Sequence, residues 1–192
     1  MNHLDAISAA CGVLVDPDLN GPFRHRATAW QAAPGEWVTV WSDETPPGPH
    51  CQLIIAHSGA VSAISHWESE GPIAGFHADS AATSLPIAEN ELHKRQQVIC
   101  VGYPSVIDHP AFSIHRGSLT PERYHPYLCP WIIRGHVALF SAEQAWLAGA
   151  GYHGMVGSPV VNHEGAVLGM LLDDQPAEPH VPPLSPFLRV TQ

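Results

Sequence analysis

A glycine-punctuated loop is the stretch of this chain whose residue types could support covalent chemistry. In residues 151–170, Gly154 and Gly157 enclose two residues and are followed by Ser158. Glycines at this spacing allow unusual φ and ψ angles or a close approach of the backbone. Such a loop can turn backbone N–H groups toward a developing oxyanion, while amide cleavage also requires a nucleophile, a base and an orienting acid.

The elements around this loop can be predicted from the same stretch. A short apolar segment follows Pro159, a turn is expected at residues 162–165, and a second apolar segment ends at Met170. Apolar runs that flank a polar, glycine-containing turn are typical of a β-hairpin. We therefore expect a buried hairpin with a backbone-rich loop at its entrance.

This stretch resembles the nucleophile loop of the trypsin-like (chymotrypsin-fold, PA clan) serine proteases. The family pattern is Gly-x-Ser-Gly-Gly/Ser-Pro, followed by a strand, a turn and Gly-x-Val-x-Gly. At the position of the family's serine this chain has Val156, which has no lone pair with which to attack a carbonyl. The other five loop positions match: Gly154, Met155, Gly157, Ser158 and Pro159.

The family's histidine signature, Leu-Thr-Ala-Ala-His-Val-Val, resembles residues 26–33. Its Thr-Ala pair matches at Thr28, but Gln31 fills the histidine position. Glutamine hydrogen-bonds but takes no proton at neutral pH, so general-base chemistry is absent there. A rival alignment places His57 at the histidine position. We favour Gln31, because the family interposes two or three strands before its aspartate and only the longer interval to Asp79 accommodates them.

The aspartate and the second half of the chain extend the resemblance. Asp79 begins a segment similar to the family's Asp-Leu-Ala-Leu-Leu-Arg-Leu, in which the aspartate orients the histidine. Here it could accept a hydrogen bond from the Gln31 amide, although an aspartate that caps a turn is an equally good reading. Residues 98–104 resemble the Val-x-Gly-Tyr/Phe-Pro strand that opens the second barrel. The resemblance therefore covers roughly residues 11–172.

The expected fold is all-β. The chain has 16 Gly and 19 Pro, which suit short strands and loops better than helices. The resemblance implies two six-stranded antiparallel β-barrels of the trypsin-like fold, over residues 1–90 and 91–172, followed by an extended proline-rich arm over 173–192. A serine N-cap and good helix formers predict one short helix at residues 141–148.

Composition excludes several classes of function. The chain of 192 residues is 45% hydrophobic and 14% charged, which is typical of a globular protein. Its net charge of −10, from 18 acidic and 8 basic residues, argues against binding to nucleic acid or anionic membranes. No apolar run approaches the roughly 18–20 residues that span a bilayer, and the start lacks a signal peptide, so a cytoplasmic location is the default expectation.

Cysteine and histidine suggest no metal site. The 4 Cys form no CxxC pair, which indicates reduced and mostly buried thiols. The 14 His are scattered, and the spacing of His153 and His163, which flank the loop, matches no ligand motif. We expect neither a metal nor a cofactor.

Two functional hypotheses remain. In the first, the chain is a pseudoprotease with degenerate triad positions at Gln31, Asp79 and Val156, and serves as a protein-binding or structural subunit of a complex. Its vestigial oxyanion loop would then grip an extended peptide in a dry, apolar cleft; that loop comprises Gly154, Met155, Val156, Gly157 and Ser158.

In the alternative, the chain is an active serine endopeptidase with a non-standard site. His57 would be the base, Asp79 its partner, and Ser158 or Ser105 the nucleophile. The family position of Ser158 faces away from the cleft, which makes the pseudoprotease the favoured hypothesis.

Overall fold

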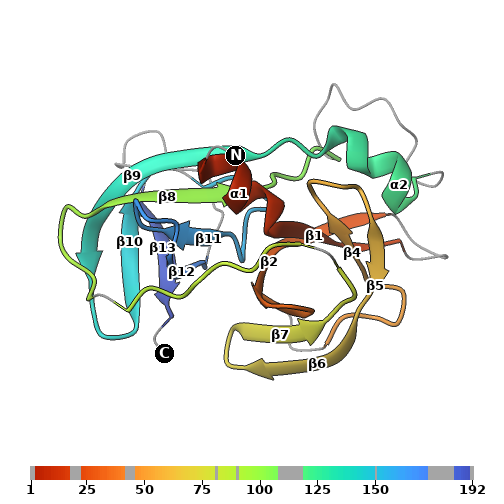
Figure 1. Cartoon of the computed structure of the whole chain (residues 1–192), viewed down its shortest axis with the longest axis horizontal. Helices are drawn as coiled ribbons and strands as arrows, with labels where there is room; N and C mark the ends of the chain where they lie inside the picture. Colours follow the sequence, from red (N-terminus) through yellow and green to blue (C-terminus); the bar gives the residue numbers. More distant parts are fainter. Residues whose placement is uncertain are drawn as a thin grey trace.

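The regular structure of the described residues is mainly antiparallel β-sheet, arranged in two halves (Figure 1). The computed structural model describes residues 3–17, 23–41, 46–80, 82–89, 91–107, 119–149, 151–172 and 184–190. One half is a curled, half-barrel sheet and the other a closed barrel. The predicted all-β fold in two barrel-like halves is confirmed; the second half has the six strands expected, whereas the first is an open sheet of seven strands.

Seven strands form the first sheet, in the order β5-β4-β1-β2-β3-β7-β6. The paired strands are antiparallel, and the long hairpin of β2 and β3 lies at the centre. The concave side of this sheet is filled by a hydrophobic cluster that includes Leu14, Trp37 and Phe76. The strands are β1 (Cys11–Asp16), β2 (Arg24–Ala33), β3 (Glu36–Val40), β4 (Gln52–Ile55), β5 (Val61–Ala63), β6 (Ser65–Glu70) and β7 (Ile73–His77).

Six strands close the second barrel, in the order β10-β13-β12-β11-β8-β9, with β9 pairing back onto β10. The predicted hairpin is confirmed as β11 and β12, and the Asn162 side chain fixes its turn by accepting hydrogen bonds from the backbone N of Glu164 (2.9 Å) and of Ala166 (3.0 Å). The strands are β8 (Gln97–Gly102), β9 (Trp131–Phe140), β10 (Gln144–Ala148), β11 (Pro159–Val161), β12 (Val167–Leu171) and β13 (Leu184–Arg189).

The helices are short and peripheral. Those in the described residues are α1 (His3–Ala9), α2 (Pro121–Tyr124) and the 3-10 helix η2 (His125–Tyr127). In the described part of the chain, no helix has the length and apolar character needed to cross a bilayer.

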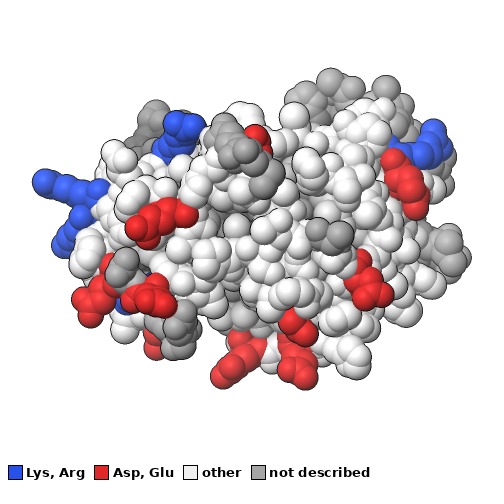
Figure 2. Space-filling model, viewed as in Figure 1, with Lys and Arg blue, Asp and Glu red and all other residues white. Residues whose placement is uncertain are grey.

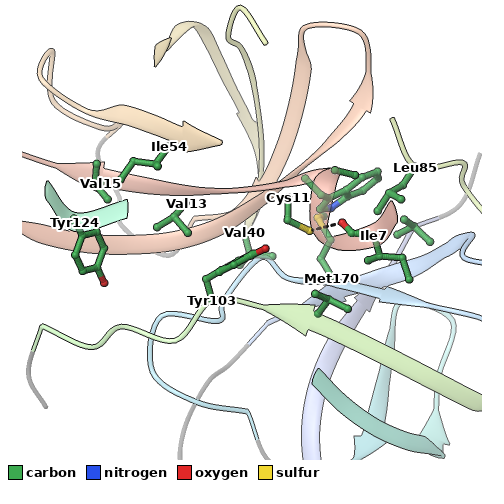
Figure 3. Close-up of a cluster of buried hydrophobic side chains, with 14 of the residues drawn as sticks. Ile7, Cys11, Val13, Val15, Val40, Ile54, Leu85, Tyr103, Tyr124 and Met170 are labelled. Atoms are coloured by element: carbon green, nitrogen blue, oxygen red, sulfur yellow. Dashed lines mark hydrogen bonds between the residues drawn. The ribbon is translucent and has the colours of Figure 1, made fainter. Parts of the chain in front are cut away.

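A shared hydrophobic cluster joins the two halves (Figure 3). Val13 and Val40 reach it from the first sheet, Tyr103 and Met170 from the second half, and Ile7 from α1. Burial of apolar surface between the halves stabilises their association, so the loop between them is held by both.

The prediction of a helix at residues 141–148 is wrong. Residues Gln144–Ala148 form β10, in which Ala145 and Leu147 are buried and their neighbours are partly exposed. Pairing with β9 on one side and β13 on the other overrides the local helix propensity. Ser141 still acts as a local cap, because its Oγ accepts a hydrogen bond from Gln144 N (3.2 Å), but it does so in a hairpin turn.

The end of the chain contributes to the second barrel. Leu184–Arg189 forms β13 between β10 and β12 rather than an arm outside the barrel. Residues 173–183, the proline-rich part of the predicted arm, lie outside the described residues.

Candidate functional site

The loop before β11 has the backbone geometry that its glycines predict. Gly154 has φ +92° and Gly157 has φ +84°, both in the region that favours glycine. Met155 N donates a hydrogen bond to Tyr152 O (3.0 Å), and Gly157 N donates to Leu171 O (2.8 Å), which ties the loop to the end of β12. The loop is therefore a fixed turn on the second barrel.

Thr28 of β2 holds this loop against the first sheet. Its backbone N donates to Val156 O (2.9 Å), and its hydroxyl donates to Gly154 O (3.3 Å) and accepts from Tyr103 N (3.1 Å). Its carbonyl accepts from the Thr39 hydroxyl (2.7 Å). Because Thr28 is fully buried, these bonds satisfy groups that water cannot reach.

His25, a histidine that the sequence did not single out, also contacts the loop. Its Nε2 lies 3.1 Å from Gly154 O and its Nδ1 lies 2.8 Å from the Tyr124 hydroxyl oxygen. A carbonyl can only accept, so Nε2 carries the proton and Nδ1 accepts from the phenol. Burial lowers the pKa of His25 to about 4, and the hydrogen bond to Gly154 opposes that shift in part. His25 is thus neutral near pH 7, with both ring nitrogens occupied, and positions the loop rather than offering a base.

The side chains of the loop face mostly inward. Met155 is fully buried in the core of the second barrel rather than lining a cleft. Ser158 is also fully buried and donates its hydroxyl to Met155 O (2.5 Å). Of the five residues predicted to bind, Val156 is the one that remains partly exposed. Val156 packs against the hydrophobic cluster shared by the two halves, so only part of its side chain reaches the surface.

The structure places Gln31 near the segment of Asp79 but away from the loop. Gln31 lies three positions beyond Thr28 in β2, on the opposite face of the strand. With the amide orientation that its neighbours require, it accepts from Gly35 N (2.7 Å) and donates to Ala82 O (2.6 Å). Asp79 is exposed after β7. In the described residues, no hydrogen bond joins either side chain to residues 154–158.

The end of β3 is the part of the first sheet that lies against the loop together with Thr28. A β-carbon on Gly157 would meet Val40 N at 2.9 Å. Residues 41–45 follow in the sequence as Trp-Ser-Asp-Glu-Thr, of which 42–45 lie outside the described residues. Residues 41–45 contain no histidine, and Gln31 carries an amide in place of an imidazole.

The alternative catalytic set is not brought together either. His57 is exposed in the turn between β4 and β5, and Asp79 follows β7, on the far side of β1, β2 and β3 in the sheet order. Ser158 is buried in the other half. Ser105 lies closer to the loop, with its backbone N bonded to His153 O (2.7 Å). Within the described ranges, no hydrogen bond or ion pair joins any two of these side chains.

Metal-ligand geometry is absent from the described part of the chain, which contains no group of three or more His, Cys, Asp or Glu arranged to hold a metal ion. His153 and His163 are both exposed, the first in the loop and the second in the β11–β12 turn.

This chain resembles known proteins in its fold and not in its sequence. No family model and no curated protein matches the sequence. The structure of the active form of the Rv3671c protease from M. tuberculosis superposes with a TM-score of 0.70 at 10% identity, covering 97% of this chain and 78% of that chain.

Two further structures of the same mycobacterial protein agree. A mutant in an inactive form gives a TM-score of 0.69 at 11% identity, covering 97% of this chain and 84% of that chain. The structure of another inactive form gives a TM-score of 0.68 at 11% identity, covering 97% of this chain and 86% of that chain. At such low identity the likeness establishes architecture and not activity. This chain has the fold of a trypsin-like serine protease.

Proposed function

We propose that this chain is a catalytically inactive relative of the trypsin-like proteases, a pseudoprotease that serves as a protein-binding or structural subunit of a complex. One observation carries the proposal: Thr28 and His25 hold the loop before β11 in a fixed conformation, while the serine position of that loop is Val156. A valine cannot form an acyl-enzyme. The scaffold of the site is thus retained without its reactive atom.

The energetic consequence of the missing groups is large. Loss of the serine or the histidine of a catalytic triad lowers the rate by about 10⁶-fold, and loss of both costs little more. Val156 lacks the hydroxyl, and neither Gln31 nor residues 41–45 include a histidine. Residual hydrolysis would be too slow to be selected, which favours binding as the retained function.

The surface beside the loop is suited to a protein partner. Trp131 and Tyr152 are 45% and 43% exposed, and their rings meet edge to face with centroids 4.6 Å apart. We call Trp131 and Tyr152 the aromatic surface. Exposed aromatic side chains of this kind are enriched at the centres of protein interfaces.

The aromatic surface adjoins the loop. Trp131 pairs across the sheet with Gly102, and Gly102 packs directly against the Ser158 side chain. The backbone N–H of Val156 donates to no other described residue, so it is available to a carbonyl of a bound peptide. An extended partner segment that crosses Val156 and covers the aromatic surface fits these features.

Alanine substitution of the aromatic surface tests this proposal on the complex isolated from the native host. With the co-purified partner identified and purified, Trp131→Ala or Tyr152→Ala should weaken its binding to the full chain by roughly tenfold or more, as expected for a buried aromatic anchor. Titration calorimetry measures the affinity. Leu139→Ala is the matched control, because Leu139 is a 51% exposed apolar residue at the other end of β9.

The control should bind within about twofold of the unsubstituted chain. Equal affinities for all three variants, or a chain that purifies from its host without a partner, would refute a binding role for the aromatic surface.

A further inference from the structure

A pocket on the outer face of the second barrel is lined by two arginines and two histidines of an acidic chain. It has a volume of about 670 Å³ and is lined by Arg95, Gln97, Arg134, His136 and His163, among others. Figure 2 shows blue Lys and Arg side chains at the left end of the molecule, where Figure 1 places the loop into β8 and the adjoining part of β9. We call this the β8–β9 pocket.

Strand register brings these side chains to one face. In the β8–β9 pair, Gln97 lies opposite His136 and Ile99 lies opposite Arg134. Residues 134 and 136 point outward, because their neighbours at 133 and 137 are buried in the barrel. Val161 of β11 pairs with Ile99 on the other side of β8, and the turn that follows β11 carries His163 to the pocket.

The backbone around Arg95 is fixed rather than free. Arg95 has φ +64°, an uncommon conformation for a residue with a side chain. Its backbone N donates to Val137 O (2.8 Å), and Val137 N donates to Gln96 O (2.9 Å), so two hydrogen bonds clamp this turn onto β9. These bonds fix the backbone position from which the exposed Arg95 side chain reaches the pocket that Arg134 also lines.

Among the described residues, no carboxylate lies in contact with the arginines of the pocket. The chain has 18 acidic residues and only 8 Lys and Arg, yet no Asp or Glu lines the pocket. Across the described ranges, neither Arg95 nor Arg134 forms an ion pair with a carboxylate. A concave site with unpaired cations on an otherwise acidic surface concentrates positive potential locally and attracts anions.

We propose that the β8–β9 pocket binds a small organic molecule through an oxyanion group, a phosphate or a carboxylate. Guanidinium groups match both oxyanions with paired N–H donors, and the His136, His163 and Gln97 side chains add further donors. A volume of about 670 Å³ exceeds what inorganic phosphate fills and is in the range of ordinary small-molecule sites. The site is separate from the loop before β11, which contacts the opposite end of β8 at Gly102.

Titration calorimetry on the purified full chain at low salt tests this site, with inorganic phosphate, pyrophosphate and citrate as probes. We expect saturable binding of one equivalent of at least one probe, and the preferred probe distinguishes a phosphate ligand from a carboxylate ligand. Arg134→Gln and Arg95→Gln should each weaken that binding by roughly tenfold or more. Both side chains are exposed, so the variants should retain the far-ultraviolet circular dichroism of the parent.

Arg24→Gln is the matched control, because Arg24 is an exposed arginine at the start of β2 in the other half of the molecule. It removes the same charge and should leave binding unchanged. The proposal fails if no probe saturates, or if Arg24→Gln weakens binding as much as Arg134→Gln does, since the effect would then come from net charge alone.

Discussion

Gly157→Ala should destabilise the protein by about 2–5 kcal/mol. Placing a side chain at φ +84° costs about 1–2 kcal/mol by itself. In addition, the new β-carbon would overlap Thr28 O and the Thr39 hydroxyl and would meet Val40 N at 2.9 Å. Forced displacement of packed neighbours typically adds about 1–3 kcal/mol. The stability is lost because the substitution disrupts the contact between the loop and the first sheet.

Urea unfolding measures this effect, and Gly165→Ala provides a matched control. Gly165 has the same φ of +84°, but the nearest atoms to its β-carbon would be those of the His3 ring, the end of a flexible side chain. The control should therefore lose only the conformational part, about 1–2 kcal/mol. Equal losses for the two variants would show that the loop does not press on β2 and β3 as described.

Lowering the pH should destabilise the folded protein, because His25 becomes protonated only at the expense of its buried arrangement. The folded-state pKa of about 4 lies below the ordinary value of 6.5, because the ring is buried against Gly154 and Tyr124. Between these values the unfolded chain binds a proton that the folded chain excludes, so stability is intact above about pH 6.5 and falls as the pH drops toward 4. With about 1.4 kcal/mol per pKa unit, the full effect is on the order of 3 kcal/mol.

Two measurements check this expectation. In an NMR titration, the His25 ring should keep its neutral Nε2–H form until the pH approaches 4. In urea unfolding at pH 7 and pH 5, His25→Gln should show a smaller loss of stability on acidification than the parent, while the exposed-site variant His57→Gln should retain the parental loss. Protonation of His25 near its ordinary pKa would contradict the buried arrangement.

The features that the sequence predicted are mainly local in origin. The hairpin of β11 and β12 follows from two apolar runs and a turn in which Asn162 caps its own backbone. The positive φ values of Gly154 and Gly157 follow from the same stretch. Local residues determine such turns, so their patterns can be read without knowledge of the tertiary fold.

The features that the sequence could not give depend on distant segments. Residues 144–148 have helix-forming side chains, but pairing on both edges makes them a strand. The Thr-Ala match in β2 suggested that Gln31 lies beside Val156, whereas Thr28 contacts the loop and Gln31 points to the other face. The role of His25 depends on Tyr124, a partner distant in sequence, and no motif marked it.

The central claim, that the loop before β11 holds no working nucleophile, is tested most directly by a fluorophosphonate probe and intact-mass spectrometry. Active trypsin, labelled in parallel, confirms that the reagent is competent. We predict that the folded chain keeps its unmodified mass, because Val156 has no hydroxyl and Ser158 is buried with its hydroxyl bonded to Met155 O. A stoichiometric adduct on any serine, mapped for instance to Ser105 or Ser158, would show that this chain is a hydrolase after all.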